Sequence, residues 1–326
     1  MPNFQRLQGC VQAFLGYDCL SSWHTINFMS LLASFFLALD RSAAGLRLRE
    51  IQVDDHKIKY AEGGRGEAVL LLHGFGAESG NWNRMAKRLT RHYRVIAPDL
   101  PGWGRSTRLE DGSYGYPVQV ERIHRLVQEL GLTRFHLMGH SMGGGIAARY
   151  AAKYPDEVMT LGLMAAHGLV EPRESAIRRA IAGGENWLLV SSPQDFQRLV
   201  DHLFIHRPPA PRAVVQYLMR QAISRREKNR QIFADMHSTD SPLIDILPQI
   251  KAPTLLIWGD EDMLVDVSAV EVFKEKISHA KALVLHSGHM PLVEHGRECA
   301  EAYLAFLDEQ AKSSPGAFLN QAAKTA

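Results

Sequence analysis

The sequence predicts an α/β protein with a mostly parallel central sheet, and three observations support that fold class. Apolar runs of strand length alternate with helix-like amphipathic segments between residues 46 and 164. The run Val69-Leu70-Leu71-Leu72 is continuously apolar, which is typical of a strand buried on both faces of a parallel sheet. The alternation stops near residue 167 and resumes at residue 254, so a helical segment is expected to interrupt the sheet.

Each element follows from a local pattern. Two strands within residues 46–61 show alternating polarity and are joined by a turn at Asp54-Asp55-His56. Helices and strands then alternate because connections between parallel strands need a crossover. We expect helices over 82–89 and 118–130, and strands over 69–72, 93–97, 135–138, 158–164, 254–258 and 282–285.

The interruption divides the chain into consecutive segments. A helical insertion after the sixth strand is most simply a cap over the carboxyl edge of the sheet, where open α/β sheets place their sites. We expect an N-terminal segment with an apolar helix over 1–46, a first core part over 47–167, a helical cap over 168–250, a second core part over 251–312 and a C-terminal tail over 313–326.

Composition excludes several functions. The 326 residues are 46% hydrophobic and 22% charged, as in a globular protein with a sizeable core. Lys and Arg total 37 against 35 Asp and Glu, and this net charge of +2 gives no field for nucleic-acid binding. Cys10, Cys19 and Cys299 form neither a C-x-x-C pair nor an even framework, so we expect neither a disulfide scaffold nor a thiolate metal site.

The most apolar stretch is residues 26–39, INFMSLLASFFLAL. It is shorter than the roughly 20 residues that cross a bilayer, unless it extends back to residue 20 and includes His24. A marginal span, a helix on the membrane surface, a contact between two copies and a buried core helix all fit. We predict membrane association, with a cytoplasmic location as the alternative, and place Arg41, Arg47 and Arg49 at anionic head groups.

A candidate nucleophile lies in Gly139-His140-Ser141-Met142-Gly143, between an apolar run and the helix-forming residues 146–152. In a G-x-S-x-G turn the serine backbone is strained, and only glycine fits two positions before and after it. The bare pattern also arises by chance in glycine-rich turns. The flanking strand and helix therefore carry the prediction that the Ser141 hydroxyl projects from the sheet edge.

Together with later motifs, this turn resembles the α/β-hydrolase superfamily over residues 48 to 310. In that family the acid lies three positions after the glycine of Trp258-Gly259-Asp260-Glu261-Asp262, which selects Asp262 rather than Asp260. The family pattern Gly-His-x-Pro selects His289 in Gly288-His289-Met290-Pro291. The resemblance thus implies a triad of Ser141, Asp262 and His289.

The same resemblance assigns His73-Gly74-Phe75-Gly76 to the oxyanion loop, with the backbone N–H groups of Phe75 and Met142 as donors. His73, Gly74, His140 and His167 are candidate substrate-binding positions, although a packing role fits His140 better and a structural role fits His167 better. Apolar cap residues are expected to form an acyl pocket: Trp187, Leu188, Leu189, Phe204, Leu218 and Met219.

Within the superfamily, Gly139-His140-Ser141-Met142-Gly143-Gly144, an apolar N-terminal segment and a helical cap resemble the Moraxella and Psychrobacter type of bacterial lipases. They are also similar to membrane-anchored monoacylglycerol lipases and lysophospholipases. The resemblance implies a serine hydrolase for carboxylic esters, acting on acylglycerol or lysophospholipid-like substrates, with no cofactor and no metal. It implies no nucleic-acid partner, and membrane association or a homodimer.

Other functions stay open. Carbon–carbon bond hydrolases and perhydrolases share the serine turn, and a non-catalytic ligand-binding relative would share the fold. Ser141 argues against the dehalogenase and epoxide hydrolase branches, whose nucleophile is an aspartate. Dinucleotide binding at Gly74-Phe75-Gly76 is not supported, because Ser79 stands where the third glycine of that fingerprint would be.

Overall fold

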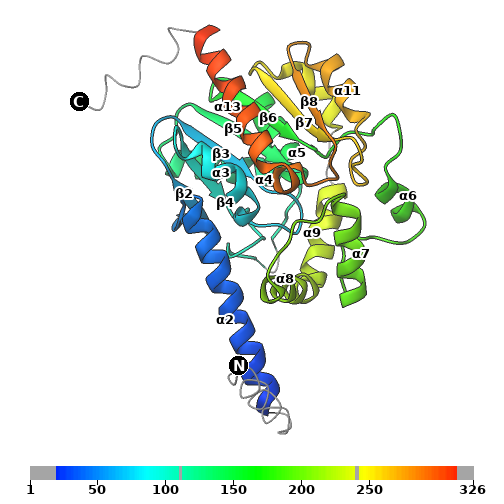
Figure 1. The fold of residues 1–326 in the computed structure, drawn as a ribbon. Coiled ribbons are helices and arrows are strands. Elements are labelled where there is room, and N and C mark those ends of the chain that lie inside the picture. Colours follow the sequence, from blue (N-terminus) through cyan, green and yellow to red (C-terminus); the bar gives the residue numbers. More distant parts are fainter. Residues whose placement is uncertain (1–19, 110–111, 239–241, 314–326) are drawn as a thin grey trace, which may run out of the picture.

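A mixed sheet forms the centre of the computed structural model, which describes residues 20–109, 112–238 and 242–313, with side chains of the first helix from Phe28 onward. Its eight strands are ordered β1-β2-β4-β3-β5-β6-β7-β8; β2 pairs antiparallel with β1 and β4, and the pairs from β4 to β8 are parallel (Figure 1). The strands are β1 Arg47–Val53, β2 His56–Gly63, β3 Ala68–Leu72, β4 Arg94–Pro98, β5 Phe135–His140, β6 Val158–Met164, β7 Thr254–Gly259 and β8 Lys281–Leu285.

The central strands are buried on both faces, as the apolar run in β3 predicts. Leu70 and Leu72 belong to one hydrophobic cluster, and the intervening Val69 and Leu71 belong to a second cluster on the opposite face. Side chains from α4 (Tyr116–Glu129), α5 (Met142–Lys153) and α11 (Ala269–Lys276) complete the first cluster. Side chains from α3 (Asn83–Leu89) and α13 (Gly296–Ser313) complete the second, and η1 (Ser79–Trp82) precedes α3.

Between the sixth and seventh strands, the described chain contains helices and loops but no strand, which confirms a helical insertion after the sixth strand. In Figure 1, α7, α8 and α9 gather on one side of the sheet, and α6 lies farther out on a loop. The cap elements are α6 Ala176–Ala182, α7 Pro193–Leu203, α8 Arg212–Ser224, α9 Arg226–Ser238, α10 Leu243–Ile246 and η2 Leu247–Gln249, and the last strands lead to α12 Pro291–Glu294.

The apolar N-terminal stretch forms most of α2 (Leu20–Ala43), which extends away from the sheet beside the cap helix α8 (Figure 1). Ala33 is buried against Ala213 and Val214 of α8, with Met29 and Leu37 packed around it. A second stripe lies on the surface: Phe28, Leu31, Phe35 and Leu39 are 60%, 69%, 57% and 50% exposed. The hypothesis of a buried core helix is therefore wrong for these side chains.

Two further expectations concern this region. Among the described residues, no helix has both the length and the apolar character that crossing a membrane requires. Arg49 is 57% exposed at its side chain and pairs with Glu62 at 3.5 Å, and the placement of Arg41, Arg47 and Arg49 at anionic head groups stays a prediction. Residues 1–19, which include Cys10 and Cys19, and the tail from 314 to 326 lie outside the described part.

Candidate active site

Ser141 occupies the turn between β5 and α5 with φ 52° and ψ −119°. A non-glycine residue in this region is strained, and such strain concentrates at functional sites. A Cβ on Gly139 would lie 2.1 Å from the carbonyl oxygen of Gly143, and one on Gly143 would lie 2.3 Å from that of Leu72. Both glycines are therefore steric requirements of the turn, as the sequence motif predicts.

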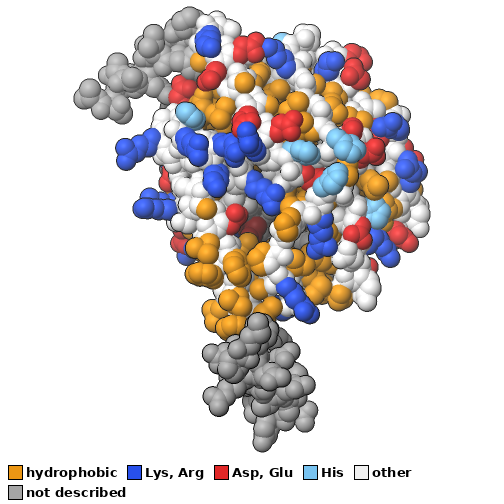
Figure 2. All heavy atoms as spheres, viewed as in Figure 1, with side chains coloured by type: hydrophobic (Ala, Val, Ile, Leu, Met, Phe, Trp, Pro, Cys, Tyr) orange, Lys and Arg blue, Asp and Glu red, His pale blue; other side chains and the backbone are white. Residues whose placement is uncertain are grey.

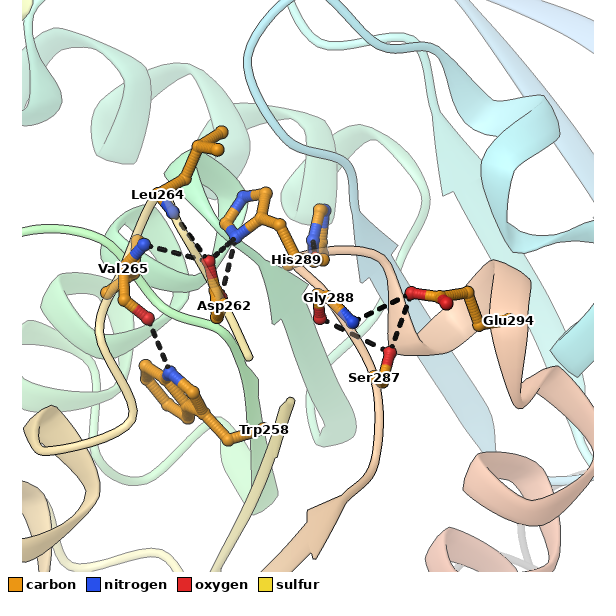
Figure 3. Close-up of polar contacts among 9 residues, drawn as sticks. Trp258, Asp262, Leu264, Val265, Ser287, Gly288, His289 and Glu294 are labelled. Atoms are coloured by element: carbon orange, nitrogen blue, oxygen red, sulfur yellow. Dashed lines mark hydrogen bonds and ion pairs between the residues drawn. The ribbon is translucent and has the colours of Figure 1, made fainter. Parts of the chain in front are cut away.

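Asp262 and His289 meet as a buried pair, with side chains 0% and 3% exposed. His289 Nδ1 lies 2.8 Å from Asp262 Oδ2 and 3.0 Å from Oδ1, so Nδ1 carries the hydrogen that it donates (Figure 3). The N–H groups of Leu264 and Val265 also donate to Oδ1, at 2.8 and 2.9 Å. The carboxylate thus leaves His289 Nε2 as the basic nitrogen.

The loop that carries Asp262 is fixed from the sheet side. Trp258 is fully buried at the end of β7, and its Nε1 donates to the carbonyl of Val265 at 2.9 Å (Figure 3). The neighbouring acid, Asp260, faces the surface and accepts hydrogen bonds from His286 and from the N–H of Ser287. The geometry therefore distinguishes the two carboxylates, and it pairs Asp262 with His289.

The expected oxyanion donors lie on both sides of Ser141. Met142 begins α5, where backbone N–H groups have no partner within the helix. Gly74 packs on the turn so closely that a Cβ there would lie 3.2 Å from the Ser141 Cβ. Phe75 follows, and its ring contacts those of Trp103 and the cap residue Phe233 at centroid distances of 4.7 and 6.0 Å.

The remaining candidate histidines are neutral; His73 and His140 are buried, and His167 is half-buried on the cavity wall. Both ring nitrogens of His73 are bonded to backbone groups: Nδ1 donates to the Gly74 carbonyl, and Nε2 accepts from the Leu100 N–H. Neither nitrogen is therefore left for a substrate. Burial lowers the pKa of His140 to about 3, and its Nε2 donates to the His289 carbonyl at 2.8 Å. Burial likewise lowers the pKa of His167 to about 3.

A cavity of about 1030 Å³ connects these groups. Ser141, His289, Gly74, His140 and His167 line it together with apolar cap residues. Of the predicted acyl-pocket residues, Leu188, Phe204 and Leu218 are on the wall, whereas Trp187 packs against His202 at a centroid distance of 3.9 Å. Further apolar wall residues that were not predicted are Ile177, Val190, Phe196, Leu199, Leu203 and Phe233.

One polar pair on the cavity wall escaped the sequence analysis. Glu171 has a side chain only 2% exposed, burial raises its pKa, and Arg178 of α6 donates to it at 3.2 Å. The two residues match no motif, and the acid lies in a loop before the helix. In the ranges 20–109, 112–238 and 242–313, no three His, Cys, Asp or Glu side chains are grouped so that they could hold a metal ion.

Comparisons with known proteins agree with this geometry. A family model described as "alpha/beta hydrolase fold" matches residues 67–296. Lipase 1 of Psychrobacter immobilis is 33% identical over 82% of this chain and 86% of its own length, and monoacylglycerol lipase abhd6-A of Xenopus laevis is 32% identical over 82% and 84%. A solved membrane phospholipase A, described as a bacterial virulence factor, is 38% identical with a TM-score of 0.86, covering 94% of this chain and 98% of that one.

The two carboxylates of the acid loop should differ sharply in mutants. Asp262→Asn removes the charge behind His289 and favours the wrong imidazole tautomer, so we expect ester hydrolysis to fall by about 10⁴-fold. Asp260→Asn changes a surface contact, and we expect a loss of less than about fivefold. Steady-state rates of both purified variants test this, and equal losses would contradict the choice of Asp262.

The half-buried His167 should make stability depend on pH. Its pKa in the folded protein lies below the 6.5 of an unfolded histidine, so the unfolded chain binds more protons in acid. The free energy of unfolding should therefore fall as the pH drops below 6.5, by about 2 kcal/mol at pH 5 from this group. Thermal unfolding at pH 7 and pH 5 should show a smaller decrease in Tm for His167→Gln than for the parent. The exposed His92→Gln is the control, and a decrease in His167→Gln as large as that of the parent contradicts the assignment.

Proposed function

Because this chain belongs to the α/β-hydrolase fold family, we propose that it is a serine hydrolase that cleaves carboxylic esters of lipids through Ser141, His289 and Asp262. The observation that carries this proposal is the strained Ser141 turn, which opens into the same apolar cavity as a histidine held by a buried carboxylate. The lipase and phospholipase names of the relatives support an acylglycerol or a lysophospholipid-like ester as substrate.

The proposed reaction has two halves. His289 Nε2 takes the proton of Ser141 Oγ as the oxygen attacks the ester carbonyl, and the tetrahedral intermediate collapses to an acyl-enzyme. The alcohol leaves with the proton from His289. A water then gives its proton to His289 and attacks the acyl carbon, and the fatty acid leaves as Ser141 recovers its proton.

Asp262 and the backbone donors would lower the barriers of both halves. The Asp262 carboxylate stabilises the imidazolium that forms at His289, while its two backbone N–H partners keep it in place. The N–H groups of Phe75 and Met142 would face the negative oxygen of each intermediate. Losing one such donor typically costs about 3 kcal/mol of transition-state stabilisation.

The cavity favours a substrate with an apolar chain and a polar end. Its wall is mainly apolar where α6, α7, α8 and α9 face the sheet, which suits an acyl chain. Glu171 and Arg178 provide a charged pair on the same wall, and they could hold a hydroxyl-bearing or zwitterionic head group.

Activity on esters of graded acyl length tests the proposed substrate class. Each methylene that the cavity buries contributes ~0.8 kcal/mol at most, so kcat/KM should rise by up to roughly fourfold per methylene before it levels off. Rates on p-nitrophenyl esters from acetate to palmitate measure this, and Ser141→Ala should remove activity at every length. A steady decrease from acetate upward would contradict an acyl-binding cavity.

We further propose that the exposed stripe of α2, formed by Phe28, Leu31, Phe35 and Leu39, rests on a lipid surface. Figure 2 shows apolar side chains gathered where the described part of α2 leaves the body. The stripe ends beside the cavity, because Asp40 on α2 lines it. A lipid ester on that surface would therefore lie close to the cavity.

Vesicle binding tests this surface contact. The triple change Phe28→Ser, Leu31→Ser and Phe35→Ser should abolish co-sedimentation with phosphatidylcholine vesicles, because the apolar stripe supplies the binding energy. The control is Val284→Ser, which replaces one exposed apolar side chain on β8, away from α2, and should bind vesicles like the parent. Unchanged binding by the triple variant would contradict the proposal, as would a stable dimer of the parent that this variant converts to monomers.

A further inference from the structure

Glu294, the last residue of α12, accepts four hydrogen bonds from two distant parts of the chain. Its Oε1 accepts from Ser287 Oγ and from the N–H of Gly288, both at 2.9 Å (Figure 3). Its Oε2 accepts from the N–H groups of Ile205 and His206, at 3.1 and 2.8 Å. One carboxylate therefore connects the loop before His289 to the cap segment that follows α7.

The two connected segments are also in direct contact. A Cβ on Gly288 would lie 2.6 Å from the carbonyl oxygen of Leu203, so the cap backbone lies against the loop. Leu203 and Phe204 belong to the wall of the cavity, just before the residues that Glu294 holds. A displacement of this cap segment would thus be transmitted to the residue that precedes His289.

His289 needs such support because its other contacts leave part of its loop unfixed. Asp262 orients the imidazole, and His140 donates to the His289 carbonyl. Neither of them holds the backbone that precedes His289. Ser287 is held at its carbonyl by the N–H of Glu261 at 3.1 Å and at its N–H by Asp260 at 3.3 Å, whereas the N–H of Gly288 donates to Glu294. Glu294 acts on that backbone.

We propose that Glu294 is a positioning residue that couples the cap wall of the acyl cavity to the placement of His289. The inference rests on the proposed ester hydrolysis and adds a residue to it. Glu294 lies outside the cavity wall, so it would act through His289 and through the cap rather than on the substrate.

The contact requires a carboxylate. Three of its four partners are backbone N–H groups, which can only donate, and a carboxylate offers two acceptor oxygens for them. In Glu294→Gln one oxygen becomes an NH₂ group, which would face the N–H of either Gly288 or of Ile205 and His206. The variant keeps the size of the side chain but must release one of the two segments.

The test compares Glu294→Gln with Glu298→Gln in the full chain. Glu298 lies four residues later, at the start of α13, and is exposed, so it controls for the same chemical change. Active sites are counted from the burst of p-nitrophenol that a p-nitrophenyl ester releases, and kcat is expressed per counted site. Misplacing the base by about 1 Å should lower kcat of Glu294→Gln by roughly ten- to a hundredfold, with the control within twofold of the parent.

A purely structural role would give a different pattern. It would lower Tm or the number of active sites but leave kcat per counted site unchanged, and a value within twofold of the parent overturns the proposal. In Glu294→Gln, KM for p-nitrophenyl octanoate should also rise, while KM for p-nitrophenyl acetate should stay near the parent value. Only the longer acyl chain reaches the cap wall.

A second variant covers the case in which Glu294→Gln does not fold. Ser287→Ala removes one of the four donors and keeps the carboxylate in place, and we expect kcat per counted site to fall by several fold. An unchanged kcat in that variant overturns the proposal. If the parent protein hydrolyses none of the esters, the proposed hydrolysis itself is wrong, and this result is distinct from normal turnover by Glu294→Gln.

Discussion

The left-handed backbone at Ser141 is the constraint on which the rest of the site depends. Holding a serine in this conformation costs roughly 1–3 kcal/mol, so the surrounding chain must enforce it. Two hydrogen bonds attach Ser141 to the end of β6 and the loop that follows it. The Ser141 N–H donates to the Met164 carbonyl, and the Ser141 carbonyl accepts from the His167 N–H. Gly139 and Gly143 let three backbones meet there, and the sheet and α5 are fixed relative to each other as a result.

The three histidines around this turn have different roles because their surroundings differ. His140 and His167 lie on the cavity wall with pKa values lowered to about 3 by burial, so they stay neutral and pack or donate hydrogen bonds. His289 lies on the same wall but has a buried carboxylate behind it, which compensates a positive charge on the ring. A proton taken from Ser141 would therefore be held at His289 rather than at its neighbours.

The sequence could predict the features that depend on neighbouring residues. The continuous apolar run of β3 indicates a strand buried on both faces, and the serine turn requires Gly139, because a Cβ there would lie 2.1 Å from the Gly143 carbonyl oxygen. Contacts between distant segments could not be predicted in this way. Neither the four bonds to Glu294 nor the pair formed by Glu171 and Arg178 has a local pattern, since each depends on how the cap folds back.

The N-terminal helix shows the same limit. Both of its stripes are apolar, so periodicity alone does not say that Ala33 packs on α8 while Phe35 faces outward. Likewise, a conspicuous tryptophan in the cap, Trp187, packs on His202 instead of lining the cavity. The motif residues of the site are separated in sequence as well, but the resemblance to a known family supplied the pairing of Asp262 with His289 that spacing alone does not give.

The claim that Ser141 is the nucleophile can be tested most directly by covalent labelling. Ser141 Oγ should attack the phosphorus of a fluorophosphonate and displace fluoride, and peptide mass spectrometry should find the phosphonyl group on the peptide that contains Ser141 and on no other. Loss of ester hydrolysis should follow the degree of labelling one to one. An enzyme that is inactivated with the label on another residue, or that hydrolyses esters at full rate with Ser141 phosphonylated, would contradict the account.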